Sequence, residues 1–246
     1  MDDNPFFKKY ANDYSKSKSH RYGEDLKILV SMIPENLDLC LDVATGTGFT
    51  AVEISKNCKN VIALDETENM LSKARELMND KNIKNISFVK SSFESYVTDL
   101  KFDLITIRRA FHHFKDKNFF MEKAHELLKN GGFLIIADML APDNDIDDNF
   151  NRLERIRDET HVGALRLDEY ISLAKEHGFS ILSLKTNVEK LSFINWLYPV
   201  KMESETGKKC FEFIKSLNND ELLRIGFDIN SMSINKKRII IKMEKQ

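Results

Sequence analysis

The sequence has little of the residues that stabilise small secreted domains. Its 246 residues include three cysteines, four prolines, nine glycines and one tryptophan. The cysteines are odd in number and widely spaced, so they form neither a disulfide framework nor a Cys-x-x-Cys zinc pattern. We therefore expect reduced thiols, with Cys40 a small buried side chain inside a strand, in a cytoplasmic protein.

The chain also lacks a charge excess and a long apolar run. Its formal net charge is −2 at pH 7, which gives no electrostatic case for nucleic acid as the main partner. Short basic clusters such as Lys-Lys-Arg at 236–238 are expected on solvated faces. No run is long enough to span a membrane, and the acidic first residues lack the apolar region of a signal peptide.

Apolar runs alternate with amphipathic segments along the chain, of which 42% is hydrophobic. The runs predict strands at 39–43, 60–64, 86–90, 103–107 and 133–138, and helices near 49–55, 68–78 and 118–128. Alternating strands and helices predict a Rossmann-like three-layer α/β sandwich with a mostly parallel sheet. Further strands at 179–184 and 238–243 bring the sheet to seven strands, of which we expect the last to be antiparallel.

Residues 41–51, Leu-Asp-Val-Ala-Thr-Gly-Thr-Gly-Phe-Thr-Ala, form the most informative segment. A strand there ends in Asp42 and a turn with Gly46 and Gly48, and a helix-like stretch follows. Glycines let the backbone turn tightly and approach a ligand, and the free N–H groups of the next helix point into the same space. This pattern predicts a pocket for a nucleotide-type cofactor.

The glycine loop alone leaves two cofactor classes open. It also matches Gly-x-Gly-x-x-Ala, the dinucleotide fingerprint, and Asp65 could bind a ribose in either class. However, Asp42 would repel a pyrophosphate and attract a cationic amino-acid group. The loop also has no Lys or Arg that could bind a phosphate.

Four segments resemble class I S-adenosylmethionine-dependent methyltransferases of the group related to ubiquinone/menaquinone biosynthesis. They follow in the expected order over residues 39–138 and read Leu-Asp-Val-Ala-Thr-Gly-Thr-Gly, Val-Ile-Ala-Leu-Asp-Glu-Thr-Glu-Asn-Met-Leu, Phe-Asp-Leu-Ile-Thr-Ile-Arg-Arg-Ala-Phe-His-His-Phe and Leu-Lys-Asn-Gly-Gly-Phe-Leu-Ile-Ile-Ala-Asp. The motifs are specific for the cofactor, S-adenosylmethionine, and not for the methyl acceptor.

The resemblance implies a set of cofactor-binding residues. Asp42 would lie near the amino group, and Asp65 would accept hydrogen bonds from the ribose, although it could also cap the helix at 68–78. Ser92 stands where the family usually has an acid near the adenine, so that contact departs from the pattern. The full set is Tyr22, Asp42, Ala44, Gly46, Gly48, Asp65, Glu66, Met70, Ser91, Ser92, Phe93 and Arg108.

Other residues are expected to face the acceptor. His112 or His113 could be a general base, or one of them could pack against the sheet edge. The acceptor-side candidates are Tyr10, Tyr14, His20, Arg109, His113, His161 and Trp196. Trp196 could belong to an aromatic pocket with Phe150, Leu153, Ile156, Phe193 and Tyr198, or these residues could be core. Arg157 and Asp158 could also meet the acceptor, but we expect surface ion pairing for these two residues.

The sequence therefore predicts a methyltransferase (class EC 2.1.1) in one domain spanning 1–246. In this interpretation 1–32 is a helical N-terminal lid, 33–140 binds the cofactor, and 141–166 and 188–227 are helical inserts on the acceptor side. The enzyme would move a methyl group to a small molecule by in-line displacement and release S-adenosylhomocysteine, with no metal. Two alternatives are a non-catalytic S-adenosylmethionine-binding module and an NAD-type oxidoreductase. The acceptor, the methylated atom and the oligomeric state stay open.

Overall fold

One open sheet runs through the whole molecule. In this computed structural model, which describes residues 5–246, seven strands follow the order β3-β2-β1-β4-β5-β8-β6, and β7 pairs with β8 alone. The strands are β1 (Leu37–Val43), β2 (Cys58–Asp65), β3 (Ile86–Lys90), β4 (Phe102–Arg108), β5 (Leu128–Met139), β6 (Phe179–Ser192), β7 (Phe227–Asp228) and β8 (Ser233–Lys245). The first five strands pair in parallel, whereas β8 is antiparallel to β5 and β6. The predicted α/β sandwich with an antiparallel last strand is confirmed, and the two-residue β7 is an addition.

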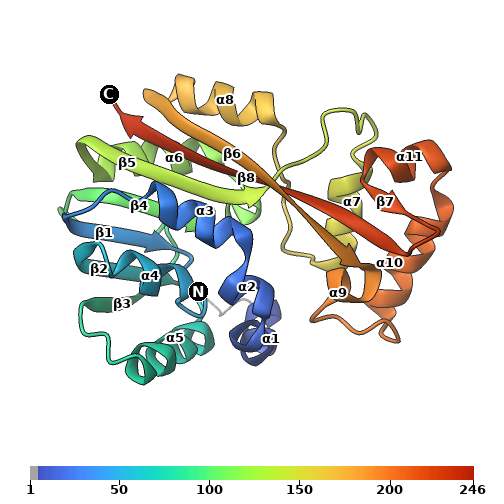
Figure 1. Cartoon of the computed structure of the whole chain (residues 1–246), viewed down its shortest axis with the longest axis horizontal. Coiled ribbons are helices and arrows are strands. Elements are labelled where there is room, and N and C mark those ends of the chain that lie inside the picture. The colour runs from blue at the N-terminus through green and yellow to red at the C-terminus, as the bar shows by residue number, and fades with distance from the viewer. Residues whose placement is uncertain (1–4) are drawn as a thin grey trace.

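Helices cover both faces of the sheet (Figure 1). They are α1 (Pro5–Lys16), α2 (Lys18–Tyr22), α3 (Glu24–Met32), α4 (Phe49–Ile54), α5 (Glu68–Asp80), α6 (Lys117–Leu127), α7 (Asn149–Arg157), α8 (Leu167–Glu176), α9 (Phe193–Leu197), α10 (Glu205–Ser216) and α11 (Asn219–Arg224), with a 3-10 turn at Phe111–His113. One core cluster joins the sheet to α3, α4 and α5, and a second joins it to α6 and α8. Helix α5 buries Met70, Leu71 and Ala74, the apolar face that its sequence predicts.

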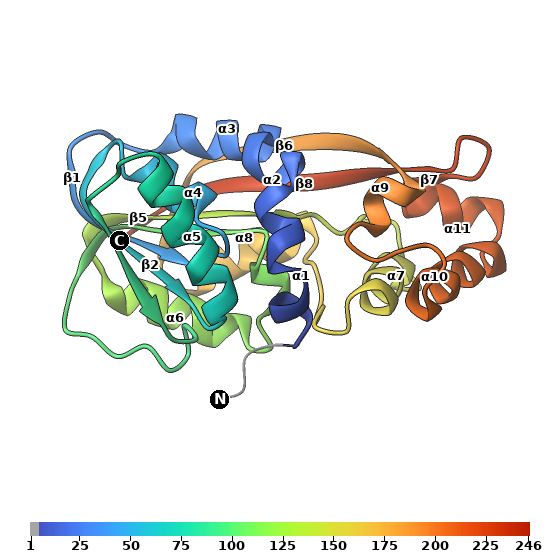
Figure 2. The same cartoon turned by 90° about the horizontal axis from the view of Figure 1, so that it is seen from below.

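Strands β6 and β8 are much longer than predicted. They pair from Phe179 opposite Lys245 to Ser192 opposite Ser233, and their far halves carry α7, α9, α10, α11 and β7 (Figures 1 and 2). The prediction that 188–227 is a helical insert is wrong for 188–192, which belong to β6. Here β6 has an alternating, half-exposed face instead of an apolar run, so the apolar pattern ends before the strand does.

Helices α1 and α2 lie between the main body of the sheet and the lobe formed by α7 and α9–α11 (Figure 2). On one side, the Asn69 amide of α5 donates to the Lys8 carbonyl of α1 at 3.2 Å. On the other side, the Tyr198 hydroxyl donates to the Asp13 carbonyl at 3.2 Å. Helix α1 therefore bridges the two parts. Residues 1–4, on which part of the predicted lid and the signal-peptide prediction fall, lie outside the described residues.

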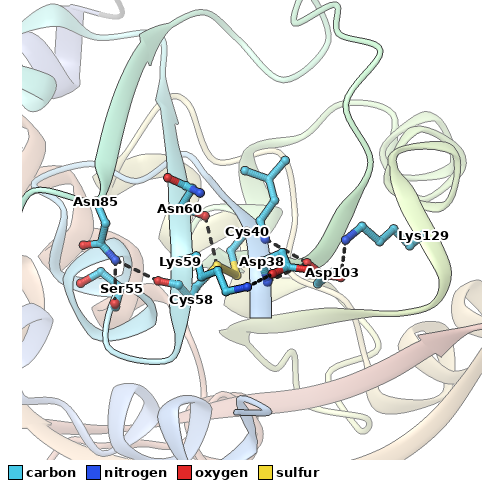
Figure 3. Close-up of a disulfide and its surroundings, with 10 residues drawn as sticks. Asp38, Cys40, Ser55, Cys58, Lys59, Asn60, Asn85, Asp103 and Lys129 are labelled. Carbon is cyan, nitrogen blue, oxygen red and sulfur yellow. Dashed lines mark hydrogen bonds and ion pairs between the residues drawn. A yellow bond between two sulfur atoms is a disulfide. The ribbon is translucent and has the colours of Figure 1, made fainter. Parts of the chain in front are cut away.

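A disulfide joins Cys40 of β1 to Cys58 of β2 (Figure 3). This contradicts our expectation of reduced thiols, although Cys40 is buried as predicted. The two cysteines are 18 residues apart in sequence, but parallel pairing of β1 with β2 brings their Cα atoms within 6.6 Å. That separation lies in the usual range for disulfides. Cys210 is a free, buried cysteine.

Within residues 5–246 no helix is both long enough and apolar enough for a membrane crossing.

Candidate functional site

A cavity of about 460 Å³ opens where the carboxyl ends of β1 to β4 meet. This edge is where open α/β sheets bind ligands. Ten of the twelve predicted cofactor residues line it: Asp42, Ala44, Gly46, Asp65, Glu66, Met70, Ser91, Ser92, Phe93 and Arg108. Tyr22 is not among them, because it ends α2 with 63% of its surface exposed and lies against Arg21. Gly48, the twelfth, belongs to the loop but faces Ala74 of α5 instead of the cavity.

Asp42 is a buried carboxylate at the end of β1. It accepts hydrogen bonds from the hydroxyls of Thr45 and Thr106, each at 2.6 Å. Burial raises the pKa of Asp42 to about 6, against the opposing effect of the two threonine hydrogen bonds. Within residues 5–246 Asp42 forms no ion pair at bonding distance, so its charge is available to a cationic ligand in the cavity.

The two glycines of the loop have different structural roles. Gly46 has a φ of +55°, and a Cβ placed on it would meet no atom within 4 Å, so its backbone borders open space in the cavity. Gly48 has a φ of +83°, and a Cβ there would lie 2.9 Å from the Cβ of Ala74. Gly46 thus permits a ligand to approach, whereas Gly48 permits α5 to pack closely against the loop.

Asp65 connects the loop to the end of β2. Its carboxylate accepts hydrogen bonds from the backbone amides of Gly46 at 2.8 Å and Thr67 at 2.9 Å. Burial raises the pKa of Asp65 to about 6, while these amide bonds oppose the rise. The N-cap of α5 is Thr67, so Asp65 is not the cap that the alternative interpretation gave it. Two oxygens have about four acceptor sites, which leaves capacity for ligand hydroxyls.

Arg108, the last residue of β4, and the adjacent Arg109 bind one buried acid. Asp25 of α3 accepts hydrogen bonds from Arg108 at 2.8 and 3.1 Å and from Arg109 at 2.8 and 2.7 Å. Burial opposes ionisation of Asp25, but these guanidinium groups hold the pKa of its carboxyl far below the usual range. Sequence reasoning missed Asp25, because Glu24-Asp25 resembles an ordinary acidic first helical turn.

Three histidines cluster beside the cavity. His112 Nδ1 lies 2.7 Å from Asp138 Oδ1, and the His112 backbone amide donates to the same carboxylate at 2.9 Å. His113 Nδ1 lies 3.0 Å from the Thr160 carbonyl. Burial, with the nearby His112, lowers the pKa of His113 to about 4. His113 is therefore neutral near pH 7, with Nδ1 as donor and Nε2 as acceptor.

His161 lies behind the other two rings. Its ring centroid is 5.1 Å from that of His112, and its Nε2 donates to Asn151 Oδ1 at 2.8 Å. Burial, with the nearby His112, lowers the pKa of His161 to about 3. His161 does not line either of the cavities described here. The structure therefore does not bring this predicted acceptor-side residue to the site.

A second cavity, of about 130 Å³, adjoins the first. The two cavities share Phe7, Tyr14, His20, Arg109 and His113 as lining residues. His112, Trp196 and Tyr198 line the second one.

Of the six residues of the hypothesised aromatic pocket, only Trp196 and Tyr198 line either of the two cavities. Phe150, Leu153 and Phe193 are core residues of the distal lobe, because α7 and α9 turn them inward against α10. Tyr10 packs against Phe6 outside both cavities.

Buried cations form one wall of the second cavity. Lys236 and Arg238 are each 5% exposed, which corrects our expectation that the cluster at 236–238 is solvated. Period-two alternation along β8 turns these two side chains inward and leaves Lys237 outside. Arg157 of α7 lies over the Trp196 ring and 2.9 Å from buried Glu154, so it is not a surface residue. Asp158 is 4% exposed.

In the part of the chain that the structure describes, no group of three or more His, Cys, Asp or Glu side chains could hold a metal ion.

Comparisons with known proteins agree with this geometry. A family model described as a methyltransferase domain matches residues 36–181, more than half of the chain. The uncharacterised methyltransferase YcgJ of Bacillus subtilis is 28% identical over 194 residues, covering 78% of this chain and 77% of that protein. A ubiquinone/menaquinone biosynthesis C-methyltransferase of Shewanella baltica is 29% identical over 140 residues, which cover 55% of each chain.

Solved structures have the same fold. The crystal structure of YcgJ superimposes with a TM-score of 0.82 at 23% identity, covering 92% of this chain and 99% of that one. A Bacillus halodurans structure described as a methyltransferase also has a TM-score of 0.82, at 30% identity, covering 91% and 99%. The family match and this likeness together show that the chain belongs to the methyltransferase family.

Proposed function

We propose that this chain transfers the methyl group of S-adenosylmethionine to a small-molecule acceptor, with the donor in the first cavity and the acceptor entering from the second. The observation that carries this proposal is the convergence of Asp42, Gly46 and Asp65 on one 460 Å³ cavity at the carboxyl edge of the sheet. That volume suits a ligand of nucleoside size.

The residues present fit S-adenosylmethionine. The open space beside Gly46, which a Cβ would enter, admits close backbone contact. Asp42 provides a negative charge for the ammonium and sulfonium groups, and Asp65 has free acceptor capacity for ribose hydroxyls. When bound, the cofactor supplies a methyl carbon activated by a sulfonium. Ser91, Ser92 and Phe93 follow β3 and border the same cavity, where an adenine would be placed.

The chain would contribute mostly by placing the reactants and excluding water. Phe7 and Tyr14 of α1 line both cavities, so α1 closes their junction from the N-terminal side. Burial raises the pKa of Tyr14 to about 12, so its hydroxyl stays protonated and can donate. These contacts support a lid role for α1, whereas α3 packs Leu29 and Met32 into the core against the sheet.

Two histidines could accept a proton from the acceptor. His113 lines both cavities and is neutral. Asp138 accepts from His112 Nδ1, which leaves Nε2 with the lone pair that a base requires. Burial opposes ionisation of Asp138, but the interaction with His112 and the backbone amides of His112 and Met139 lower its pKa to about 2, so the carboxylate stays ionised and orients the ring. We assign the role of general base to His112, with Asp138 as its positioning residue.

Two measurements test the function. Isothermal titration calorimetry should detect S-adenosylhomocysteine binding and no comparable NAD binding. Transfer of isotope-labelled methyl from S-adenosylmethionine should then appear with at least one member of a broad small-molecule panel. Binding without transfer to any acceptor would instead favour a non-catalytic cofactor-binding module. Tight NAD binding without S-adenosylhomocysteine binding would favour an oxidoreductase. A cytoplasmic location and the single-domain division given above stay predictions.

A further inference from the structure

Cationic side chains outnumber carboxylates on the wall of the second cavity. Four of its lining residues are cationic, and two, Asp138 and Asp158, are acidic. The cations are Arg109, Arg157, Lys236 and Arg238.

Both carboxylates of the wall are already engaged. Asp138 accepts from the ring and the backbone amide of His112. Asp158 accepts from the Thr160 amide at 3.0 Å and from the Thr160 hydroxyl at 2.6 Å. Among residues 5–246, the ion pairs of the four wall cations are with Asp25, Glu154 and Glu189, and not with these two acids.

The carboxylates behind the wall are shared among several cations. Asp25 accepts four hydrogen bonds from two arginines. Glu154 accepts from Lys236 Nζ at 2.9 Å and from the Trp196 indole at 3.0 Å, with Arg157 as its other ionic neighbour. These two carboxylates hold the cations in place, but each carboxylate is shared by more than one cation.

Arg238 has hydrogen-bonding capacity left over. Its Nη2 donates to Glu189 at 3.0 Å, but its Nε has no hydrogen-bond partner in residues 5–246 and lies 4.0 Å from Asp25. Arg157 Nε likewise has no partner there. A buried donor without a partner is costly, and both arginines border the same cavity.

We propose that the second cavity is an anion subsite, in which Arg157, Lys236 and Arg238 bind a carboxylate or phosphate group of the methyl acceptor. This inference rests on the proposed function, which places the acceptor there. Arginine and lysine together are suited to such groups, because guanidinium N–H groups match carboxylate and phosphate oxygens. At about 130 Å³ the cavity suits an ionised group with few attached atoms. The acceptor's remaining atoms would lie at the junction formed by Arg109 and His113.

The ionisation of Lys236 agrees with this assignment. Burial, together with the neighbouring Arg157 and Arg238, lowers the pKa of Lys236 to about 7 against the attraction of Glu154. A bound anion would therefore favour the charged form of Lys236. Occupation of the cavity and protonation of the lysine would reinforce each other.

The single tryptophan of the chain is a built-in probe for this site. Trp196 lines the second cavity, and the Arg157 guanidinium lies 5.0 Å from its ring centroid. The experiment uses the full chain saturated with S-adenosylhomocysteine, at constant ionic strength maintained with sodium chloride. Inorganic phosphate is titrated in one arm and acetate in the other. We expect a saturable change in Trp196 emission, and the arm with the tighter binding identifies a phosphate-bearing or a carboxylate-bearing acceptor.

Variants of neighbouring residues on β8 provide matched controls. Lys236→Met and Arg238→Met should weaken anion binding roughly ten- to hundredfold, as for a lost charge-assisted hydrogen bond. Lys237→Met, on the exposed side of the same strand, should leave the binding curve unchanged. Lys236→Arg keeps a cation opposite Glu154, so it should fold and retain binding even if the methionine variant does not fold.

S-adenosylhomocysteine affinity, measured on the same samples, separates this inference from the proposed function. Normal S-adenosylhomocysteine binding with a linear or absent response to both anions would overturn the anion subsite alone. An equal loss in Lys237→Met and Arg238→Met would also overturn it. Failure of the wild-type chain to bind S-adenosylhomocysteine would instead contradict the proposed function.

Discussion

Asp42→Asn should separate cofactor binding from stability. The substitution keeps the side-chain shape but removes the negative charge at the end of β1. A hydrogen bond to a charged partner contributes about 1.5–3 kcal/mol. We therefore expect S-adenosylhomocysteine to bind about ten- to hundredfold more weakly to the variant at pH 8. The threonine hydroxyls that contact Asp42 can reorient to accept from the new amide.

The same substitution should stabilise the ligand-free protein at pH 8. Because burial raises the pKa of Asp42 to about 6 from 3.8, folding favours the protonated acid. This contribution to the free energy of unfolding is fully present below about pH 4 and is lost as the pH rises through 6. The ionised form then costs up to about 3 kcal/mol at 1.36 kcal/mol per pKa unit. Asparagine does not ionise, so the variant does not lose this stability.

Calorimetry and urea denaturation at pH 8 and pH 5 check both results. Wild-type affinity should fall at pH 5, where Asp42 becomes protonated, and the variant should fall less. Part of the dependence should persist in the variant, because the pKa of Asp65 is also raised to about 6 by burial. Wild-type affinity in Asp42→Asn at pH 8 would refute the role of the carboxylate. Unfolding of the ligand-free variant at lower urea concentration than the wild type would refute the electrostatic reasoning.

Three further substitutions address other parts of the site. Asp65→Ala should weaken S-adenosylhomocysteine binding about ten- to hundredfold through lost ribose contacts, and unchanged affinity in calorimetry would contradict its assignment. Gly48→Ala should lower the free energy of unfolding by about 1–3 kcal/mol, since φ is +83° and the new Cβ would lie 2.9 Å from Ala74 Cβ. A variant with the thermal midpoint of the wild type would be inconsistent with that close approach. The pKa of His161 is lowered to about 3, so between pH 6.5 and 5 only the unfolded chain takes up a proton at this residue, and the wild-type protein loses stability. His161→Gln should reduce that loss in the free energy of unfolding by about 2 kcal/mol. Equal losses in both proteins during urea denaturation would contradict this.

The base assignment is tested by Asp138→Asn together with His112→Gln. Each should lower turnover by about 10²–10⁴, the usual contribution of general acid–base catalysis, without a matching loss of cofactor affinity. Because Asp138 orients a ring instead of contacting the acceptor, its variant should also alter the pH–rate profile. A purely structural role would leave that profile unchanged.

Much of the cofactor cavity could be predicted from the sequence because its residues follow local strand-end patterns. Asp42 and Asp65 lie at the carboxyl ends of β1 and β2, and Gly46 lies in the loop after β1; parallel pairing brings such positions to one edge. The helix at 68–78 is likewise strongly amphipathic, and α5 covers that range.

The second cavity could not be predicted, because its residues meet only through long-range packing. Lys236 and Arg238 resemble a solvated charge run until β8 is known to extend to Ser233. The period-two alternation that buries them was the available signal, but β8 was predicted to begin only at 238. The acids near these cations, Asp25, Glu154 and Glu189, come from three distant elements. The Cys40–Cys58 disulfide was missed for the same reason, since it depends on the pairing of β1 with β2.

A crystal structure of the chain with S-adenosylhomocysteine tests the central claim most directly. The account predicts the ribose within hydrogen-bond distance of Asp65, the amino group beside Asp42, and the sulfur facing the junction of the two cavities at His113. S-adenosylhomocysteine bound elsewhere, or with its sulfur turned away from that junction, would contradict it.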